Sequence, residues 1–135
     1  MGADQYHEPP AELPAETRTF ARLSASLTEE AEAIGWYEQR LAVEPNDEAR
    51  AIMRDAQGEE FKHFCMDLEF LLRKTPVWRE IAQGILFQGG DIVAHGEAAE
   101  AAADGGASDG AAIGPDRSPV GSGSLGIGSL KERVS

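Results

Sequence analysis

This 135-residue sequence has one cysteine and few basic residues, and it has no aromatic residue after Phe87. The single cysteine, Cys65, cannot form an internal disulfide, and no run approaches the ~20 apolar residues of a membrane span or the apolar run of a signal peptide. Only 12 Lys and Arg stand against 24 Asp and Glu, and the net charge of −12 disfavours binding to nucleic acid or an anionic membrane. We therefore expect a soluble cytoplasmic protein that favours cationic partners.

The scarcity of large side chains after Phe87 also indicates where the packed region ends. The stretch from Gly89 to Val120 contains seven Gly and nine Ala and no aromatic residue, so it offers little apolar area to offset chain entropy. We predict four segments, namely an extended N-terminal segment (1–14), one helical domain (15–90), a flexible linker (91–120) and a terminal peptide (121–135).

Proline and capping residues divide the domain into three predicted helices. The first runs over about residues 15–43 and stops at Glu44-Pro45, and Asn46 can cap a second helix that runs to about residue 74. Thr75-Pro76 begins a short third helix to about residue 88. The predicted fold is all-α, an antiparallel two-helix hairpin plus a short third helix.

Three ionisable residues interrupt the apolar faces of the two long helices. Glu30 lies at the centre of the first helix's apolar face, and Glu60 and His63 lie within that of the second. Burying a carboxylate without a partner costs several kcal/mol, so these groups need a salt bridge, a solvated seam or a metal ion. Glu60 and His63 form a Glu-x-x-His motif, which with a Glu on the preceding helix is half of a four-helix di-iron carboxylate site.

The other half of such a site is missing from the chain, because His63 is the only histidine within the three expected helices. The simplest completion is a two-fold dimer in which both chains contribute Glu30, Glu60 and His63, forming a ferritin-like four-helix bundle. Four glutamates would then balance the charge of two divalent ions. The dimer would also cover the broad apolar face of the second helix.

Several residues around this trio have two open interpretations. Tyr37 lies on the same face of the first helix as Glu30, where it either packs in the core or lies beside the metal. Glu29, Glu32 and Trp36 share a different side of the helix, which is either a protein contact with cation-collecting acids or a solvated acidic face.

The remaining candidates carry weaker signals. Asp67 and Glu59 either support the site from outside or are solvated, and Cys65 is expected to pack rather than to bind metal. His7 and His95 lie outside the expected helices, and we assign them no role.

The C-terminal peptide restores apolar residues after the Gly- and Ala-rich stretch. Leu125, Ile127 and Leu130 alternate with glycine and serine, a pattern that suits an extended peptide whose side chains enter pockets of a partner. Chance apolar residues in a tail are the alternative.

Taken together, these motifs resemble the encapsulated ferritins, which are ferritin-like cargo proteins of encapsulin nanocompartments. The resemblance covers roughly residues 7–88 and the terminal peptide. It is carried by Glu29-Glu30-Ala-Glu32, Trp36-Tyr37, Glu59-Glu60-Phe-Lys-His63, Leu68-Glu69-Phe70, Leu86-Phe87 and Gly123-Ser-Leu-Gly-Ile-Gly-Ser-Leu130.

This resemblance implies a ferroxidase that oxidises Fe²⁺ with O₂ and supplies iron for mineral storage inside the encapsulin nanocompartment. It implies that Glu30, Glu60 and His63 ligate two iron ions between subunits, with Tyr37 close by. It also implies that Glu29, Glu32 and Trp36 line a metal uptake route, and that five dimers form a ring. The tail with Leu125, Ile127 and Leu130 would dock on the encapsulin shell protein.

Two positions depart from the family pattern. Asp55 stands where relatives often have histidine, and Gly35 where they often have Asp. Two rival functions remain, a non-enzymatic helical adaptor stapled by structural metal and a di-iron peroxidase. An oxygen carrier of the hemerythrin type would need more histidines than the helices hold.

Overall fold

The computed structural model describes residues 6–109, and all regular structure within them is helical. A short 3₁₀ helix, η1 (Pro10–Glu12), is followed by α1 (Ala15–Val43), α2 (Asp47–Lys74), α3 (Pro76–Ile85) and α4 (Ile92–Asp109). The predicted all-α class is confirmed. Within this part of the chain, no helix is long and apolar enough to cross a membrane.

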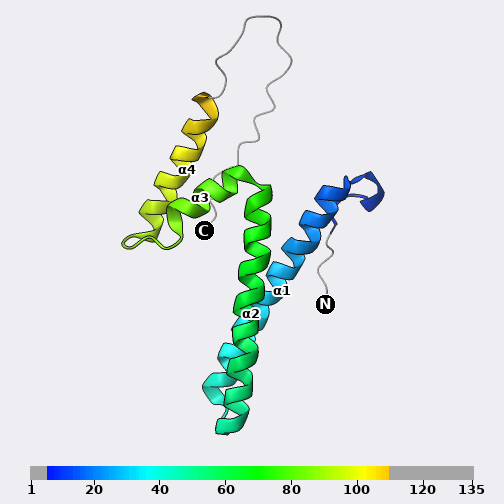
Figure 1. Ribbon diagram of the computed structural model, residues 1–135, viewed down its shortest axis with the longest axis vertical. Helices are drawn as coiled ribbons and strands as arrows, with labels where there is room; N and C mark the ends of the chain where they lie inside the picture. Colours follow the sequence, from blue (N-terminus) through cyan, green and yellow to red (C-terminus); the bar gives the residue numbers. More distant parts are fainter. Residues whose placement is uncertain (1–5, 110–135) are drawn as a thin grey trace, which may run out of the picture.

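Helices α1 and α2 form the predicted antiparallel hairpin (Figure 1). The turn is fixed by Asn46, whose side-chain Oδ1 accepts a hydrogen bond from the Ala49 amide at 2.9 Å. Arg50 donates to the carbonyl oxygens of Leu41 and Glu44, and so ties the end of α1 to the start of α2. The helix bounds at this turn agree with those expected from the proline and the cap.

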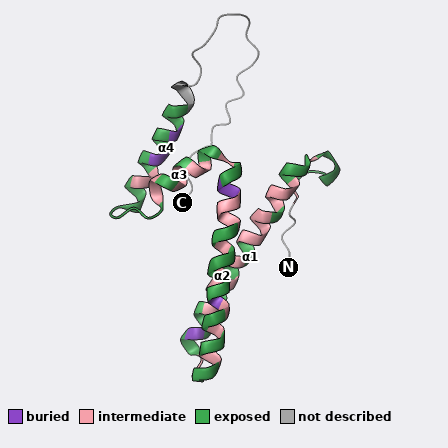
Figure 2. Cartoon of the chain, in the orientation of Figure 1, coloured by how far each residue is buried: buried purple, intermediate pink, exposed green. Residues whose placement is uncertain are grey.

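The two long helices lie together near their turn and diverge toward their opposite ends (Figure 1). Leu41, Leu71 and Leu72 are buried, but most apolar side chains of the hairpin are only half-buried or exposed (Figure 2). Phe61 is 50% and Met66 is 62% exposed on α2. One chain alone therefore does not cover the apolar surface of its hairpin.

Helix α4 corrects the expectation of a flexible linker over residues 92–109. It packs against α3 through small residues, with Ala99 and Ala103 buried. A Cβ added to Gly84 would lie only 2.6 Å from the Ala99 Cβ, so the two helices approach as closely as glycine allows. Glycine and alanine therefore form the contact between α3 and α4, although such small side chains bury little apolar area. Residues 110–120 lie outside the described part of the chain.

The loop between α3 and α4 also differs from expectation. Helix α3 ends at Ile85 rather than near residue 88, and Phe87 follows with a positive φ of 62°. Asp91 caps α4 by accepting hydrogen bonds from two amides, and the His95 Nε2 lies 2.8 Å from the Gly89 carbonyl oxygen. At the other end of the chain, the segment expected to be extended contains η1.

Candidate metal centre

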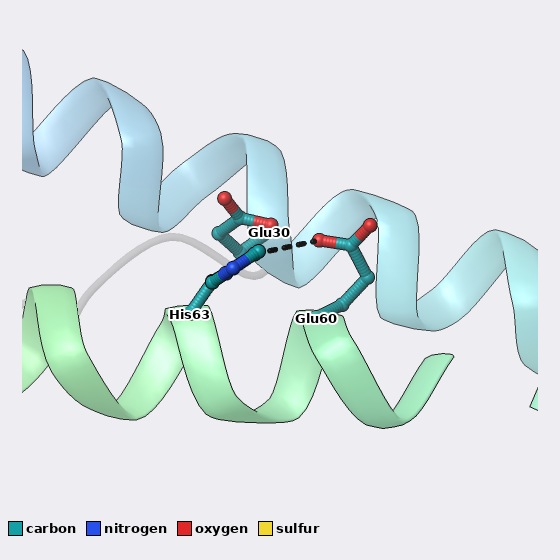
Figure 3. Close-up of side chains that lie close together, drawn as sticks. All are labelled: Glu30, Glu60 and His63. Carbon is teal, nitrogen blue, oxygen red and sulfur yellow. Dashed lines mark ion pairs between the residues drawn. The ribbon is translucent and has the colours of Figure 1, made fainter. Parts of the chain in front are cut away.

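Glu30, Glu60 and His63 meet where α1 and α2 lie side by side (Figure 3). One ligand atom from each lies within 4.8 Å of the others, and the His63 Nδ1 is 3.9 Å from the Glu60 Oε2. Glu60 and His63 share a face because they are three residues apart on α2. The antiparallel pairing with α1 brings Glu30 to that face, as the sequence predicted.

The Glu30 carboxyl has a raised pKa in this arrangement. The hydrogen bond with Glu60 contributes most to the rise, followed by burial and by the negative charge of Glu60, while the charge of His63 opposes it and that of Asp67 adds to it. Two facing carboxylates disfavour their joint ionisation. A cation placed between them would remove this conflict, so the site is electrostatically suited to a metal ion.

The three side chains are partly open to solvent. The side chain of His63 is 47% exposed and that of Glu60 is 23% exposed. Within residues 6–109 this is the only group of three or more His, Cys, Asp or Glu side chains close enough to hold one ion. An ion held by these three side chains would be bound from one side only, which leaves room for donor atoms from another chain.

The other residues named from the sequence do not join this group. Tyr37 is half-buried, and its ring lies under the Arg40 guanidinium, whose Cζ is 5.2 Å from the ring centroid. Trp36 is 54% exposed, and Glu29 and Glu32 are exposed as well. The docking residues Leu125, Ile127 and Leu130 lie outside the described part of the chain.

Other residues of α2 that the sequence analysis considered lie on its solvent-exposed side. The Glu59 carboxylate pairs with Lys62 on the solvent side of α2, and its pKa is lowered by that hydrogen bond. Asp55 is exposed, and so is Cys65, contrary to the expectation that Cys65 packs.

Gln57 is a site neighbour that the sequence analysis missed. It is only 6% exposed, and its Nε2 donates to the Ile34 carbonyl at 3.3 Å and to a Glu38 carboxylate oxygen at 3.0 Å. The side chain therefore ties α1 to α2 beside Glu30, Glu60 and His63. The position of Gln57 on the apolar face of α2 was the sequence feature that could have indicated this role.

Several pockets border the hairpin within the described residues. One of about 300 Å³ is shared with the ligand group and is lined by Ser26, Glu30, His63, Met66 and Asp67. A larger one of about 400 Å³ lies between the start of α1 and the end of α2, with Phe20 and Phe70 among its lining residues.

Comparison with known proteins identifies a matching family and related sequences. The sequence model of the EncFtn-like family matches residues 5–89. An encapsulated ferritin-like protein of Rhodospirillum rubrum is 41% identical over 131 residues, which is 97% of this chain and 91% of that protein. A ferritin-like protein of Thermotoga maritima is 44% identical over 85 residues, which is 63% of this chain and 75% of the relative.

A solved structure extends the comparison to the fold. The crystal structure of a Nitrosomonas europaea protein superposes with a TM-score of 0.64 at 37% sequence identity. The match covers 66% of this chain and 98% of the other.

Proposed function

The chain belongs to the EncFtn-like family, the encapsulated ferritins, and on that basis we propose that it is a ferroxidase. It oxidises Fe²⁺ to Fe³⁺ with O₂ at a site shared by two subunits. The observation that carries this proposal is the convergence of Glu30, Glu60 and His63, whose ligand atoms lie within 4.8 Å of one another.

The donor set fits iron oxidation. Carboxylate oxygens are hard ligands that stabilise Fe³⁺ more than Fe²⁺, and they therefore favour loss of an electron from the substrate ion. The imidazole of His63 adds a neutral donor. Each Fe²⁺ loses one electron, and O₂ is the acceptor.

The role of each residue follows from its position. Glu30 faces Glu60 across the two helices, and this placement suits carboxylates that hold cations between subunits. A second copy of the chain would contribute the same three side chains and close the open half-site. Tyr37, on the same stripe as Glu30, is proposed to lie beside the metal in that dimer.

Further residues of the family pattern are included in the proposal. Glu29, Glu32 and Trp36 are exposed on α1, a position compatible with a metal uptake route and with contacts between dimers. A ring of five dimers is the proposed assembly.

The proposed destination is the interior of an encapsulin nanocompartment. A relative that matches 97% of this chain is named an encapsulated ferritin-like protein, and the match therefore extends beyond the helical domain. We propose that residues 121–135 dock on the encapsulin shell through Leu125, Ile127 and Leu130. The oxidised iron would then be stored as mineral inside the shell.

Stopped-flow oxidation of Fe²⁺ by the isolated protein, with O₂ and separately with H₂O₂, tests the proposal. A ferroxidase oxidises Fe²⁺ with O₂ well above the buffer rate. A strong preference for H₂O₂ would instead favour a di-iron peroxidase. Metal binding and assembly without turnover would favour a structural, metal-stapled adaptor.

A further inference from the structure

A pocket of about 400 Å³ lies where the two long helices diverge (Figure 1). Phe20 of α1 and Phe70 of α2 are among its lining residues, together with Thr19 and Lys74. Both phenylalanine side chains are only half-buried in the single chain. An apolar side chain that filled this pocket would remove more of their surface from water, which stabilises a complex.

The pocket lies on the face of the hairpin that carries the candidate metal group. Phe70 and Lys74 follow His63 by seven and eleven residues on α2, and at 100° per residue both point within about 20° of its direction. On α1, the pocket residue Thr19 lies within about 20° of Glu30 by the same arithmetic. A second copy that completes the metal group therefore also covers the pocket.

Ile52 is an exposed apolar side chain on the other side of the metal group. It lies eleven residues before His63, also within about 20° of its direction, and it is 66% exposed. At a rise of about 1.5 Å per residue, Ile52 lies about 16 Å from His63 toward the turn, and Lys74 lies as far from His63 in the opposite direction. The exposed side chain and the pocket are therefore at matching distances from the metal group.

Two orientations of a second copy bring the two metal groups together at one level. In a parallel dimer, each Ile52 would meet the other Ile52, and the two pockets would face each other unfilled. In an antiparallel dimer, the two-fold axis runs perpendicular to the helices and places each Ile52 opposite the pocket of the other chain. Only the antiparallel orientation covers the exposed side chain and fills the pocket at once.

The distribution of charge favours the same orientation. Residues 36–56, around the turn, contain five acidic and three basic side chains, whereas residues 15–24 and 67–74, at the divergent end, contain three acidic and four basic ones. An antiparallel dimer brings these opposite net charges together, and a parallel dimer brings like charges together. Lys74 is exposed at the divergent end and pairs with no carboxylate among residues 6–109, so its ammonium is available to an acidic side chain of the second copy's turn.

We propose that the second copy lies antiparallel to the first, with its Ile52 in the pocket between Phe20 and Phe70 and with the reciprocal contact at the other end of the dimer. This inference rests on the two-subunit site of the proposed function. The two contacts lie about 16 Å from the metal group, one on either side, and together they prevent one hairpin from sliding along the other. They thereby hold the two halves of the metal site at the same level.

Cross-linking of cysteine variants by a short bismaleimide tests this orientation in the Zn²⁺-bound protein, with Cys65→Ser as the background. Ile52→Cys combined with Thr19→Cys in one chain should give covalent dimers, because the two positions meet across the interface. Within one chain they lie about 28 Å apart along the hairpin, which is too far for an internal link. Ile52→Cys alone should give none, because its two copies lie at opposite ends of an antiparallel dimer.

Val43→Cys combined with Thr19→Cys is the matched control. Val43 is 80% exposed near the same turn, but it points about 140° away from Glu30 on α1. This pair should not cross-link. In a second measurement, Ile52→Asp should weaken the dimer by about ten-fold or more in a native-mass titration, and Val43→Asp should change its affinity by less than about two-fold.

Three results would overturn the inference, namely no covalent dimer from the Ile52→Cys and Thr19→Cys chain, covalent dimers from Ile52→Cys alone, or an Ile52→Asp dimer as tight as that of the wild type. These failures leave the proposed function intact, because a parallel dimer also brings two metal groups together. Conversely, cross-links in the expected pattern without Fe²⁺ oxidation by O₂ would support the orientation and contradict the ferroxidase. A chain that stays monomeric with metal would contradict both.

Discussion

Glu30 is the residue in which the needs of folding and function conflict most clearly. Its carboxyl faces Glu60 with a raised pKa, which means that the folded chain without metal disfavours the charged form. A site built for a cation is expected to have this property, because the bound ion removes the repulsion.

This conflict predicts how Glu30→Gln changes the stability of the metal-free chain. A raised folded-state pKa contributes stability that is fully present below the ordinary value near 4.5 and is lost as pH rises through the raised pKa. At pH 7 the Gln variant should therefore melt higher than the wild type, by on the order of 2 °C, and the difference should shrink at pH 4. Thermal unfolding of both proteins in the presence of a chelator, at pH 7 and at pH 4, measures the difference in melting temperature.

The neighbouring substitution Glu29→Gln is the control for that experiment, since Glu29 is exposed. The Glu29→Gln variant should show nearly the same change in melting temperature between pH 4 and pH 7 as the wild type. A Glu30→Gln variant that is less stable than the wild type at pH 7 without metal would show that the carboxylate contributes favourable contacts instead.

Some site residues could be predicted from the sequence and others could not. The convergence of Glu30, Glu60 and His63 was predictable because a charged residue in an apolar stripe is conspicuous once the helical period is known. The role of Gln57 was not, because its main partners are a backbone carbonyl and a carboxylate on another helix. Helical periodicity specifies the face of a residue but not its partner across the interface.

At the scale of elements, the long helices were predictable and α4 was not. Pro45 and Asn46 lie in the hairpin turn between α1 and α2, and Pro76 is the first residue of α3. Proline and a capping side chain act locally, so these helix bounds could be predicted from the sequence. Helix α4 has few large apolar residues, and it approaches α3 closely where Gly84 meets Ala99. Such tertiary contacts leave little trace in composition.

Gly84→Ala tests the packing of α4. The added Cβ would lie 2.6 Å from the Ala99 Cβ, so α4 must shift away from α3. Overpacking of this kind costs about 1–3 kcal/mol, and we expect hydrogen exchange of the α4 amides to speed up by about ten-fold or more.

Gly35→Ala is the matched control, because nothing lies within 4 Å of the position of its added Cβ in the middle of α1. That variant should gain about 0.5–1 kcal/mol of stability and leave α4 exchange unchanged. Equal α4 protection in Gly84→Ala and the wild type would argue against the close α3–α4 contact.

At the scale of the whole molecule, the single chain is incomplete in two respects. The His63 side chain of the candidate metal group is 47% exposed, and apolar side chains such as Phe61 and Met66 are exposed on α2. A second copy would supply the missing ligands and cover apolar area at once.

We therefore predict that metal stabilises the dimer. Without metal, the dimer would bring four carboxylates together, and chelation should shift the native mass toward monomer or lower the melting temperature. Added Zn²⁺ should reverse the change in the wild type but not in His63→Ala. A metal-free chain that stays dimeric at nanomolar concentration with an unchanged melting temperature would contradict this linkage.

The proposed shell address predicts a separable C-terminal peptide. Deleting residues 121–135 should leave Fe²⁺ oxidation and assembly unchanged but stop co-purification with a co-expressed encapsulin shell. Many tails on one ring would add avidity to a weak single contact. Fusing these residues to an unrelated protein should load it into the shell. Loss of oxidation with loading intact would assign the tail to the catalytic domain.

The most direct test of the central claim is the rate of Fe²⁺ oxidation by O₂ in Glu60→Ala beside that in Glu59→Ala. The two carboxylates are adjacent in sequence, but only Glu60 lies in the group of side chains that could hold a metal ion, whereas Glu59 pairs with Lys62. The wild type and Glu59→Ala should oxidise Fe²⁺ well above the buffer rate, and Glu60→Ala should fall to that rate. A Glu60→Ala variant that oxidises Fe²⁺ at the wild-type rate would contradict the assigned site.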